Sequence, residues 1–491
     1  MQRKPIILSI LAVVFLALCC PITRAQTITA SVNGTVTDSS GAILPNAKVT
    51  ATNVETGINT ETTTNNDGIY NIRFLQIGSY KVTISAAGFG DSTYGPFALE
   101  TGQNAKIDGK LSIAGTQQKV SVEAEVAPLL NTENPTLATT LDTRAIENIP
   151  LVGRNLTAIT MFLPGSVSTQ PNSFVSNAAV SGPLSGNNMS GQASGASVSV
   201  NGNRQQANQY LLDGMNVNQT LDDTQGYVPN VDAIAQVQVI SANANAEYGN
   251  VNGGDILYQT KSGTNNWHGS MFYFVNNYNL DANSWVNQHS PVKVPKNSYT
   301  RNLFGGTFGG PIFKDKLFFF VDYQGGRFHS GGTSTANVYT QKMRQGDFSE
   351  LLDPAIMGAG KTIQLYDSTT AGIPAYANNK VQVTNPAAQY LFAHPELYPL
   401  PNAAPNPGTP TLRNYRGLQK QRNYGNQFDV KVDYRVSEKD NLFVRYSQMD
   451  SGQTTQSALI TSFNSAPTFP FKGVAINEVH QFSSSVINEF R

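Results

Sequence analysis

The feature that most constrains the fold is strand-like alternation in a chain that offers no membrane helix beyond its first residues. In the segment 426–434, Phe428, Val430 and Val432 alternate with charged residues, so one face is apolar and the other polar. This pattern is typical of a transmembrane barrel strand, with lipid outside and the lumen inside. Past residue 25, no apolar run reaches the length of a membrane helix. Any part that enters a membrane must therefore form a closed β-barrel, which pairs its own backbone polar groups.

The N-terminus predicts export. Arg3 and Lys4 form a short basic start, an apolar run covers 6–20, and Ala25 ends a stretch suited to cleavage. We therefore expect a signal peptide over 1–25, with an uncleaved membrane anchor as the alternative. Both cysteines of the chain lie within this segment. Neither disulfides nor Cys-ligated metals are expected in the exported protein.

The charge balance argues against a nucleic-acid partner. Lys and Arg number 33, and Asp and Glu also number 33, so the net charge is zero. Charged residues make up 13% of the chain, well below the usual share of about a quarter. Asn, Gln, Ser, Thr and 42 Gly take their place, which is usual for β-rich proteins outside the cytoplasm.

The first region, 26–126, predicts a small β-sandwich. Short alternating segments are separated by turn residues such as Asp67-Gly68. An ordered series of matches resembles the carboxypeptidase regulatory-like domain, which has an Ig-like, carbohydrate-binding-like sandwich fold. The matching segments are Gly34-x-Val36, Pro45-x-Ala47-x-Val49, Thr56-Gly57, Asp67-Gly68-x-Tyr70 and Gly78-x-Tyr80-x-Val82. The resemblance implies no peptidase chemistry, and carbohydrate binding is an expectation at the level of the fold alone.

The second region, 127–254, mixes helix and strand. An amphipathic stretch over 141–149 predicts a helix stopped by Pro150, and 233–240 alternates as a strand. Between them, 165–195 is rich in Ser, Gly and Asn, which is typical of a mobile loop.

This second region contains three short motifs, Gly153-Arg154-Asn155, Leu211-Leu212-Asp213-Gly214 and Ala246-Glu247-Tyr248-Gly249. These motifs resemble the plug domain of Oar-like TonB-dependent receptors. Two departures are Val152, where the family more often has Asn, and the segment 255–259. The motif residues that we single out as structural site candidates are Gly153, Arg154, Asn155, Asp213, Gly214, Glu247, Tyr248 and Gly249.

The third region, 255–491, predicts barrel strands. The strand candidates cover 267–275, 303–310, 316–323, 426–434 and 441–446, with weaker ones near Val474 and Val486. The stretch 325–421 is rich in Pro, Asn and Ala and predicts a long extracellular loop. A soluble insert domain is the alternative for this stretch.

The start of this region resembles an Oar-like barrel most closely. The segment beginning Lys261-Ser262-Gly263 matches the plug-to-barrel junction of the family, and Gly309 and Gly310 end a matching strand. We take Lys261, Gly263, Gly309 and Gly310 as further site candidates. The two strand glycines are expected to let the backbone pack closely against the plug.

The three regions together predict a mainly β protein with a sandwich, an α+β plug and the first strands of an incomplete transmembrane barrel. Roughly eight strand candidates follow residue 255, whereas plugged outer-membrane transporters need about 22. Open sheet edges are untenable in lipid, so we expect the chain to be a fragment or an early truncation.

The resemblance implies a receptor or transporter in the bacterial outer membrane. Its ligand would bind outside, while the plug blocks the lumen until an inner-membrane complex pulls on it through TonB. The sequence contains no clear TonB box. Expected partners are outer-membrane lipid, the TonB complex and an unknown extracellular ligand. Carbohydrate is one candidate for that ligand. A surface adhesion or carbohydrate-binding protein that uses the sandwich is the alternative, and a hydrolase ranks last.

No enzymatic or metal chemistry is predicted. The five histidines are not spaced three or four residues apart, so no compact zinc signature exists. No nucleophile elbow is present, and the paired glycines lie on a strand rather than in a nucleotide loop. We therefore expect no catalytic residues, no cofactor and no metal.

Overall fold

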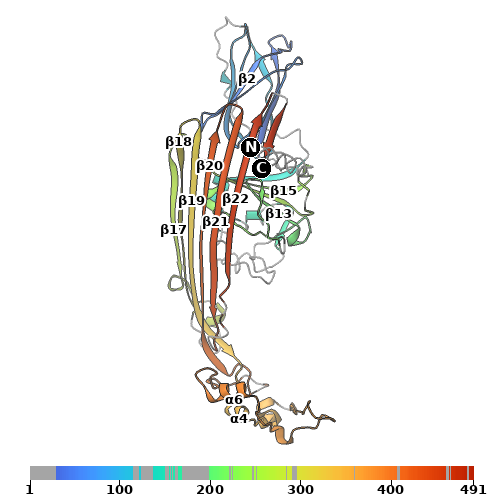
Figure 1. Cartoon of the computed structure of the whole chain (residues 1–491), viewed down its shortest axis with the longest axis vertical. Helices are drawn as coiled ribbons and strands as arrows, with labels where there is room; N and C mark the ends of the chain where they lie inside the picture. Colours follow the sequence, from blue (N-terminus) through green and yellow to red (C-terminus); the bar gives the residue numbers. More distant parts are fainter. Residues whose placement is uncertain are drawn as a thin grey trace, which may run out of the picture.

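A computed structural model shows three β-rich parts (Figure 1), which confirms the mainly β class. The predicted signal peptide lies outside the described residues. The structure describes residues 29–113, 121–122, 136–149, 154, 156, 159–160, 164–168, 198–220, 223, 225–245, 248–249, 251–283, 285–289, 296–358, 360–405, 408, 410–459, 464, 466–483 and 486–491.

The N-terminal part is a sandwich of two sheets, and side chains alternate between its core and solvent. One sheet holds β1 (Ala30–Asp38), β4 (Ile69–Leu75), β7 (Asn104–Lys106) and β8 (Gly109–Leu111). The other has the order β3 (Asn59–Thr63), β2 (Lys48–Asn53), β5 (Gly78–Ser85), β6 (Ser92–Leu99) and β9 (Ser121–Val122). Val32, Val49 and Ile84 are fully buried between the sheets, as the alternation predicts.

The second part, called the plug below, is built on a five-stranded sheet. Its order is β10 (Leu137–Asp142), β15 (Ile234–Ala242), β16 (Asp255–Thr260), β13 (Gln209–Leu212) and β14 (Met215–Asn216). A separate hairpin joins β11 (Ser166–Ser168) to β12 (Val198–Val200), and most of the loop expected over 165–195 lies outside the described residues. Short 3-10 turns cover Gln205–Ala207 and Val231–Ala233.

Two expectations for the plug need correction. The helix expected over 141–149 is α2 (Thr143–Asn148), because Asp142 ends a strand paired with β15 and caps the helix at the Ala145 backbone N–H. The barrel was expected to start at residue 255, but β16 pairs with β13 and β15 inside the plug sheet. The barrel strands therefore begin at β17.

The third part, called the barrel sheet below, is a single antiparallel sheet in sequence order. Its strands are β17 (His268–Asn277), β18 (Ser298–Phe313), β19 (Leu317–Ala336), β20 (Tyr415–Arg435), β21 (Asp440–Gln456), β22 (Thr468–Gln481) and β23 (Ile487–Phe490). Figure 1 shows the plug strands β13 and β15 against one face of this sheet and the sandwich at one end. Between β17 and β18 lie a 3-10 turn (Tyr278–Leu280) and the helix α3 (Trp285–Gln288).

The long loop is shorter than predicted. β19 and β20 stay paired out to Ala336 and Tyr415, so the connection covers 337–414 rather than 325–421. It also contains short helices, which the sequence did not predict. They are α4 (Gln341–Arg344), α5 (Pro354–Met357), α6 (Pro386–Ala393) and 3-10 turns at Ser349–Leu352 and Ala377–Asn379. In Figure 1, α4 and α6 lie at the end of the sheet opposite the sandwich.

Alternation along β20 gives the barrel sheet an outward apolar face and an inward polar face, as predicted for 426–434. Asp429, Lys431 and Asp433 are at most 7% exposed, although they are charged. The plug covers them, so the inner face of the sheet becomes a buried polar interface.

Candidate functional site

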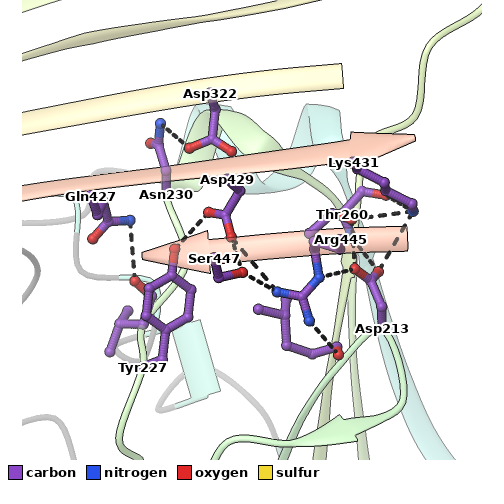
Figure 2. A network of polar contacts seen from close by, with 12 residues as sticks. Asp213, Tyr227, Asn230, Thr260, Asp322, Gln427, Asp429, Lys431, Arg445 and Ser447 are labelled. Carbon is purple, nitrogen blue, oxygen red and sulfur yellow. Dashed lines mark hydrogen bonds and ion pairs between the residues drawn. The ribbon is translucent and has the colours of Figure 1, made fainter. Parts of the chain in front are cut away.

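The candidate site is the polar interface between the plug and the inner face of β19, β20 and β21 (Figure 2). One side is supplied by plug turns and the other by alternate residues of three neighbouring strands. Burial makes each charge costly unless it is paired, so the pairing pattern defines what the interface does.

Asp213 lies at the centre of the plug side. With Gly214 it forms the tight turn between β13 and β14, and both have positive φ, 48° and 77°. Such a turn favours Asp-Gly because Gly adopts positive φ without strain. The turn points a carboxylate that is 0% exposed toward the barrel sheet.

Two hydrogen bonds and two cations hold the Asp213 carboxylate. The backbone N–H and hydroxyl of Thr260 donate to it at 2.9 and 2.7 Å. Arg445 Nε lies at 2.8 Å and Lys431 Nζ at 3.8 Å. Burial alone would raise the pKa of Asp213, but the two cations and Thr260 outweigh it and hold this pKa below its usual value. The carboxylate is therefore ionised and paired across the interface.

Arg445 of the barrel sheet contacts acceptors on the plug and acceptors on its own sheet. Its guanidinium contacts Asp213, lies 3.6 Å from Asp429 on β20, and donates to the Leu212 carbonyl of the plug at 3.0 Å. It also donates to Ser447, whose hydroxyl donates to Asp429. The fork of donors on one Arg can serve all these acceptors at once.

A second group of contacts continues the network along the plug. The Tyr227 hydroxyl donates to Asp429 at 2.6 Å, and its ring stacks on Phe471 of β22 at 4.6 Å between centroids. Burial and the neighbouring carboxylates raise the pKa of Tyr227 well above its usual value, so it remains a donor. Gln427 donates to the Val228 carbonyl at 3.3 Å.

Arg154 makes a separate plug–barrel contact. It pairs with Asp232 of the plug at 2.6 Å, and its guanidinium lies 5.0 Å from the ring centroids of Phe272 and Phe274 on β17. Cation–π contacts of this kind stabilise a desolvated guanidinium against an aromatic face. The predicted neighbours of Arg154, Gly153 and Asn155, lie outside the described residues.

The plug-to-barrel junction holds two more predicted residues. Lys261 pairs with Glu147 of the plug at 3.2 Å. A Cβ at Gly263 would lie 2.4 Å from the Phe319 carbonyl oxygen and 2.6 Å from that of Gly310. Only a residue without a side chain fits this approach between the junction and the barrel sheet.

The two strand glycines do not serve the expected purpose. A Cβ at Gly310 would meet the indole of Trp267 at 2.4 Å, and one at Gly309 would meet Phe320 at 3.0 Å. The nearest atoms at both positions belong to the barrel sheet or to Trp267, the residue just before β17, and not to the plug. The close backbone approach to the junction is made by Gly263 instead.

Of the remaining predicted plug residues, the structure describes Tyr248 and Gly249. Tyr248 is 7% exposed and packs in a small core with Leu211 and Leu257. Gly249 has open space where a Cβ would stand. Glu247 lies outside the described residues.

The sandwich is bonded to both other parts. Asn265 of the junction donates to the Thr56 carbonyl at 2.8 Å and to Asp315, in the β18–β19 turn, at 2.6 Å. Thr101 donates its backbone N–H and hydroxyl to Gln236 of β15 at 2.9 and 2.7 Å. Gln238 donates back to the Thr101 carbonyl at 2.9 Å.

Sequence reasoning missed the barrel side of this site. Lys431 and Asp429 fell on the predicted inward face of their strand, and Arg445 lay in a predicted strand whose faces were not assigned, but no motif pointed to any of them. Thr101 carried no signal, and Asn265 was noted only as the last residue of the matched junction segment 261–265, because the role of both depends on how the three parts meet. Asp213 was found through its motif.

One cluster among the described residues has metal-ligand character. Asp440, Glu478 and His480 present ligand atoms within 4.8 Å of one another, at the ends of β21 and β22. Asp440 already bonds to His480 and accepts from Ser437. Histidine spacing could not predict this group, because its members meet across two strands. Within the described part of the chain, no helix is long and apolar enough to cross a membrane.

Three families match separate stretches of the chain. Residues 31–112 match the carboxypeptidase regulatory-like domain, 155–254 the TonB-dependent receptor plug domain, and 259–491 the outer membrane beta barrel domain. The TonB-dependent transporter Oar of Myxococcus xanthus is 25% identical over 294 residues, which cover 59% of this chain and 26% of Oar. The chain therefore spans about a quarter of the length of this curated relative.

Among the similar solved structures are an outer membrane transporter and a siderophore receptor. The outer membrane transporter YddB from Escherichia coli is 14% identical with a TM-score of 0.42, over 70% of this chain and 37% of YddB. The siderophore receptor PirA from Acinetobacter baumannii is 14% identical with a TM-score of 0.31, over 70% of this chain and 45% of PirA.

Proposed function

We propose that this chain, a member of the Oar-like TonB-dependent outer-membrane receptors with an N-terminal carboxypeptidase regulatory-like domain, takes part in uptake of an extracellular ligand. The observation that carries the proposal is the buried network around Asp213. It holds the plug against the barrel wall with buried paired charges, which lie beside an apolar contact of the plug core with Met449 and Phe471. Paired charges can re-form with water and other partners, so such a contact suits a plug that must be released.

The strand connections suggest how the chain lies in the membrane. The turn between β18 and β19 and the turn between β20 and β21 are short, and they lie at the sandwich end. The 337–414 connection lies at the other end. Outer-membrane barrels have short periplasmic turns and long extracellular loops, which puts the sandwich in the periplasm and this connection outside.

The partners follow from the family. The outer membrane supplies lipid around the apolar face, and a TonB complex would act on the plug from the periplasm. We also propose the division into a signal peptide (1–25), a sandwich (26–126), a plug (127–254) and barrel (255–491), with the plug boundary moved past β16. The ligand is proposed only as an extracellular one. No described contact favours adhesion or hydrolysis.

Fractionation and gel mobility test the proposal. The full-length protein is expected in the outer-membrane fraction, and it should migrate differently in a gel before and after heating because a closed barrel resists detergent. Uptake of the ligand should be lost in cells that lack TonB, whereas surface binding is retained. A purely soluble periplasmic protein would contradict the proposal.

A further inference from the structure

The outward face of the barrel sheet contains a hollow of about 830 Å³ that spans β17, β18, β19 and β20. Two glycines create it, because each stands opposite a large side chain. Gly269 is paired with Phe308, and Gly306 is paired with Met271. The polar side chains that alternate with these residues face the inner side of the sheet. The outward lining is completed on β19 and β20 by Val321, Tyr323 and Phe428.

Trp267 lies at the end of the hollow that is nearer the sandwich. Its indole stacks on Phe308 at 5.4 Å between ring centroids and meets the edge of Phe319 at 5.7 Å. Aromatic side chains form girdles of this kind at the borders of the apolar band of an outer-membrane barrel. The hollow extends from this girdle towards the 337–414 connection.

A row of basic side chains continues the same outward face beyond the hollow, towards the end that carries α4 and α6 (Figure 1). Arg327 follows Tyr323 on this face of β19, and Arg422 and Lys420 follow Phe428 on this face of β20. Arg327 donates to the Asn426 side chain at 2.9 Å and lies 5.8 Å from the ring centroid of Phe304, which holds its guanidinium at this level.

The charge of this row is not balanced by its neighbours. Arg422 and Lys420 are exposed, and the residues opposite them on β19 and β21 are uncharged or basic, namely His329, Gly331, Thr454 and Gln456. The acid Asp450 lies nearer the hollow, opposite Asn426. Three bases therefore face one acid at this level, and the row attracts an anion.

The spacing between the hollow and the row matches one leaflet of a membrane. Phe428 and Arg422 are six residues apart on β20, which is about 20 Å along an extended strand. With the usual strand tilt of about 40°, this distance corresponds to a height of about 15 Å. Half of a hydrocarbon core of about 30 Å is equally thick. A lipid with an acyl chain in the hollow would therefore carry its headgroup at the level of Arg422.

We propose that this surface binds one phosphorylated lipid of the outer leaflet, with an acyl chain in the hollow and the phosphate on the basic row. Arg327 and Arg422 are diagonal neighbours across β19 and β20, and such neighbours are about 7–8 Å apart, so both can reach one phosphate. Guanidinium groups bind phosphate through paired, charge-assisted hydrogen bonds, and Lys420 adds a third positive charge. The choice of leaflet rests on the proposed function, which places the 337–414 connection outside.

Quenching of Trp267 by brominated lipids tests the site. The chain has two Trp, so Trp285→Phe leaves Trp267, which lines the hollow, as the reporter. The full chain with this change is extracted from outer membranes in detergent and titrated with phosphatidylglycerol or phosphatidylcholine, each brominated in the distal part of its acyl chains. Saturable quenching is expected. Phosphatidylglycerol should half-saturate it at a concentration at least about fivefold lower, because this lipid brings a net negative charge to the basic row.

Matched variants separate the basic row and the hollow from the rest of the sheet. Arg422→Gln should raise the half-saturating concentration of phosphatidylglycerol about fivefold and leave that of phosphatidylcholine unchanged. Lys472→Gln, which removes an exposed outward base on β22, should change neither value. Val321→Phe fills the hollow and should reduce quenching by both lipids. Val444→Phe, on the outward face of β21, should not.

Several outcomes would overturn the proposal. They are equal half-saturation by the two lipids, an unchanged value in Arg422→Gln, and equal effects within either matched pair of variants. Displacement of phosphatidylglycerol by excess inorganic phosphate would also overturn it, because the basic row would then be a site for a free anion. The proposed function fails at membrane fractionation, before any lipid is added, so the two failures are distinguishable.

Discussion

At the residue scale, Asp213 carries the connection between plug and barrel. Asp213 was singled out in the sequence by a family motif, and the structure shows why Asp-Gly stands there, because a tight turn with positive φ restricts the residue types. Its partners, Arg445 and Lys431, lie more than two hundred residues away, and nothing in their local sequence distinguishes them from other inward-facing polar residues. A motif can therefore locate one half of a buried ion pair, but only the fold identifies the other half.

Removing the Asp213 charge should loosen the plug. Asp213→Asn leaves Arg445 and Lys431 buried without their main anion, which costs about 3–5 kcal/mol. Hydrogen exchange of the β13 and β14 amides should speed up accordingly. Asp450→Asn, an exposed acid on β21, should have no such effect. The double variant Asp213→Asn with Arg445→Met should recover part of the loss; strictly additive losses would show that the two residues do not interact.

Asp255 should make the plug sensitive to pH. Burial raises the pKa of this carboxyl to about 6, and one of its oxygens has no hydrogen-bond partner. Because the folded state holds the proton more tightly than the unfolded chain, the stabilising contribution is complete below pH about 4 and is lost as pH rises through 6.

Asp255→Asn remains uncharged at every pH. At pH 7.5 its β13 and β16 amides should be better protected from exchange, by about 1–3 kcal/mol after correction for intrinsic rates. The difference should vanish at pH 4. The exposed Asp223→Asn serves as the control in the same part of the chain. Equal protection of the Asp255→Asn and unaltered chains at pH 7.5 would show that burying the ionised carboxylate of Asp255 does not destabilise the plug.

At the scale of elements, the periodicity of the sequence located every strand of the barrel sheet, but it did not give the lengths of those strands. The apolar stretch of β19 was clear, whereas its continuation to Ala336 is polar and rich in Gly, so only pairing with β20 reveals it. The boundary expected at residue 255 left β16 on the barrel side for a related reason, whereas β16 pairs within the plug sheet. Its residues are buried on both faces, and a short buried strand carries no sign of which sheet it joins.

Gly263 sets how closely the junction approaches the barrel sheet. Gly263→Ala would place a methyl group against two carbonyl oxygens of neighbouring strands, and backbone cannot move aside as a flexible side chain can. We expect a lower yield of heat-modifiable barrel in outer membranes. Gly249→Ala, where a methyl group meets open space, should assemble normally. Equal yields from the two variants would contradict this account of the junction.

At the scale of the whole molecule, three parts that the sequence presents as a series are bonded to one another. Sequence patterns describe each part separately, because strand alternation and turn motifs are local. The contacts of Thr101 and Asn265 join residues far apart along the chain, and they involve polar side chains of ordinary surface type. Their role could not be predicted without coordinates.

Asn265 should keep the sandwich docked. Asn265→Ala removes the bonds to Thr56 and Asp315, each worth about 0.5–1.5 kcal/mol. Faster hydrogen exchange is expected in the Glu55–Gly57 turn, with the plug sheet unchanged. Asn266→Ala alters the next residue without removing those bonds and should leave exchange in that turn as it was. Acceleration by both variants alike would mean that docking does not depend on Asn265.

The contacts of Thr101 with β15 have a mechanical consequence. In the proposed function, a periplasmic pull would be transmitted through a series of attachments, and the weakest of these would rupture first. The neutral bonds that hold the sandwich are weaker than the buried ion pair that holds the plug. Extraction should therefore proceed in two force steps, in which the sandwich detaches before the plug yields. The sandwich contacts would then set the first, lower force step, and the buried ion pair would set the load at which the plug yields.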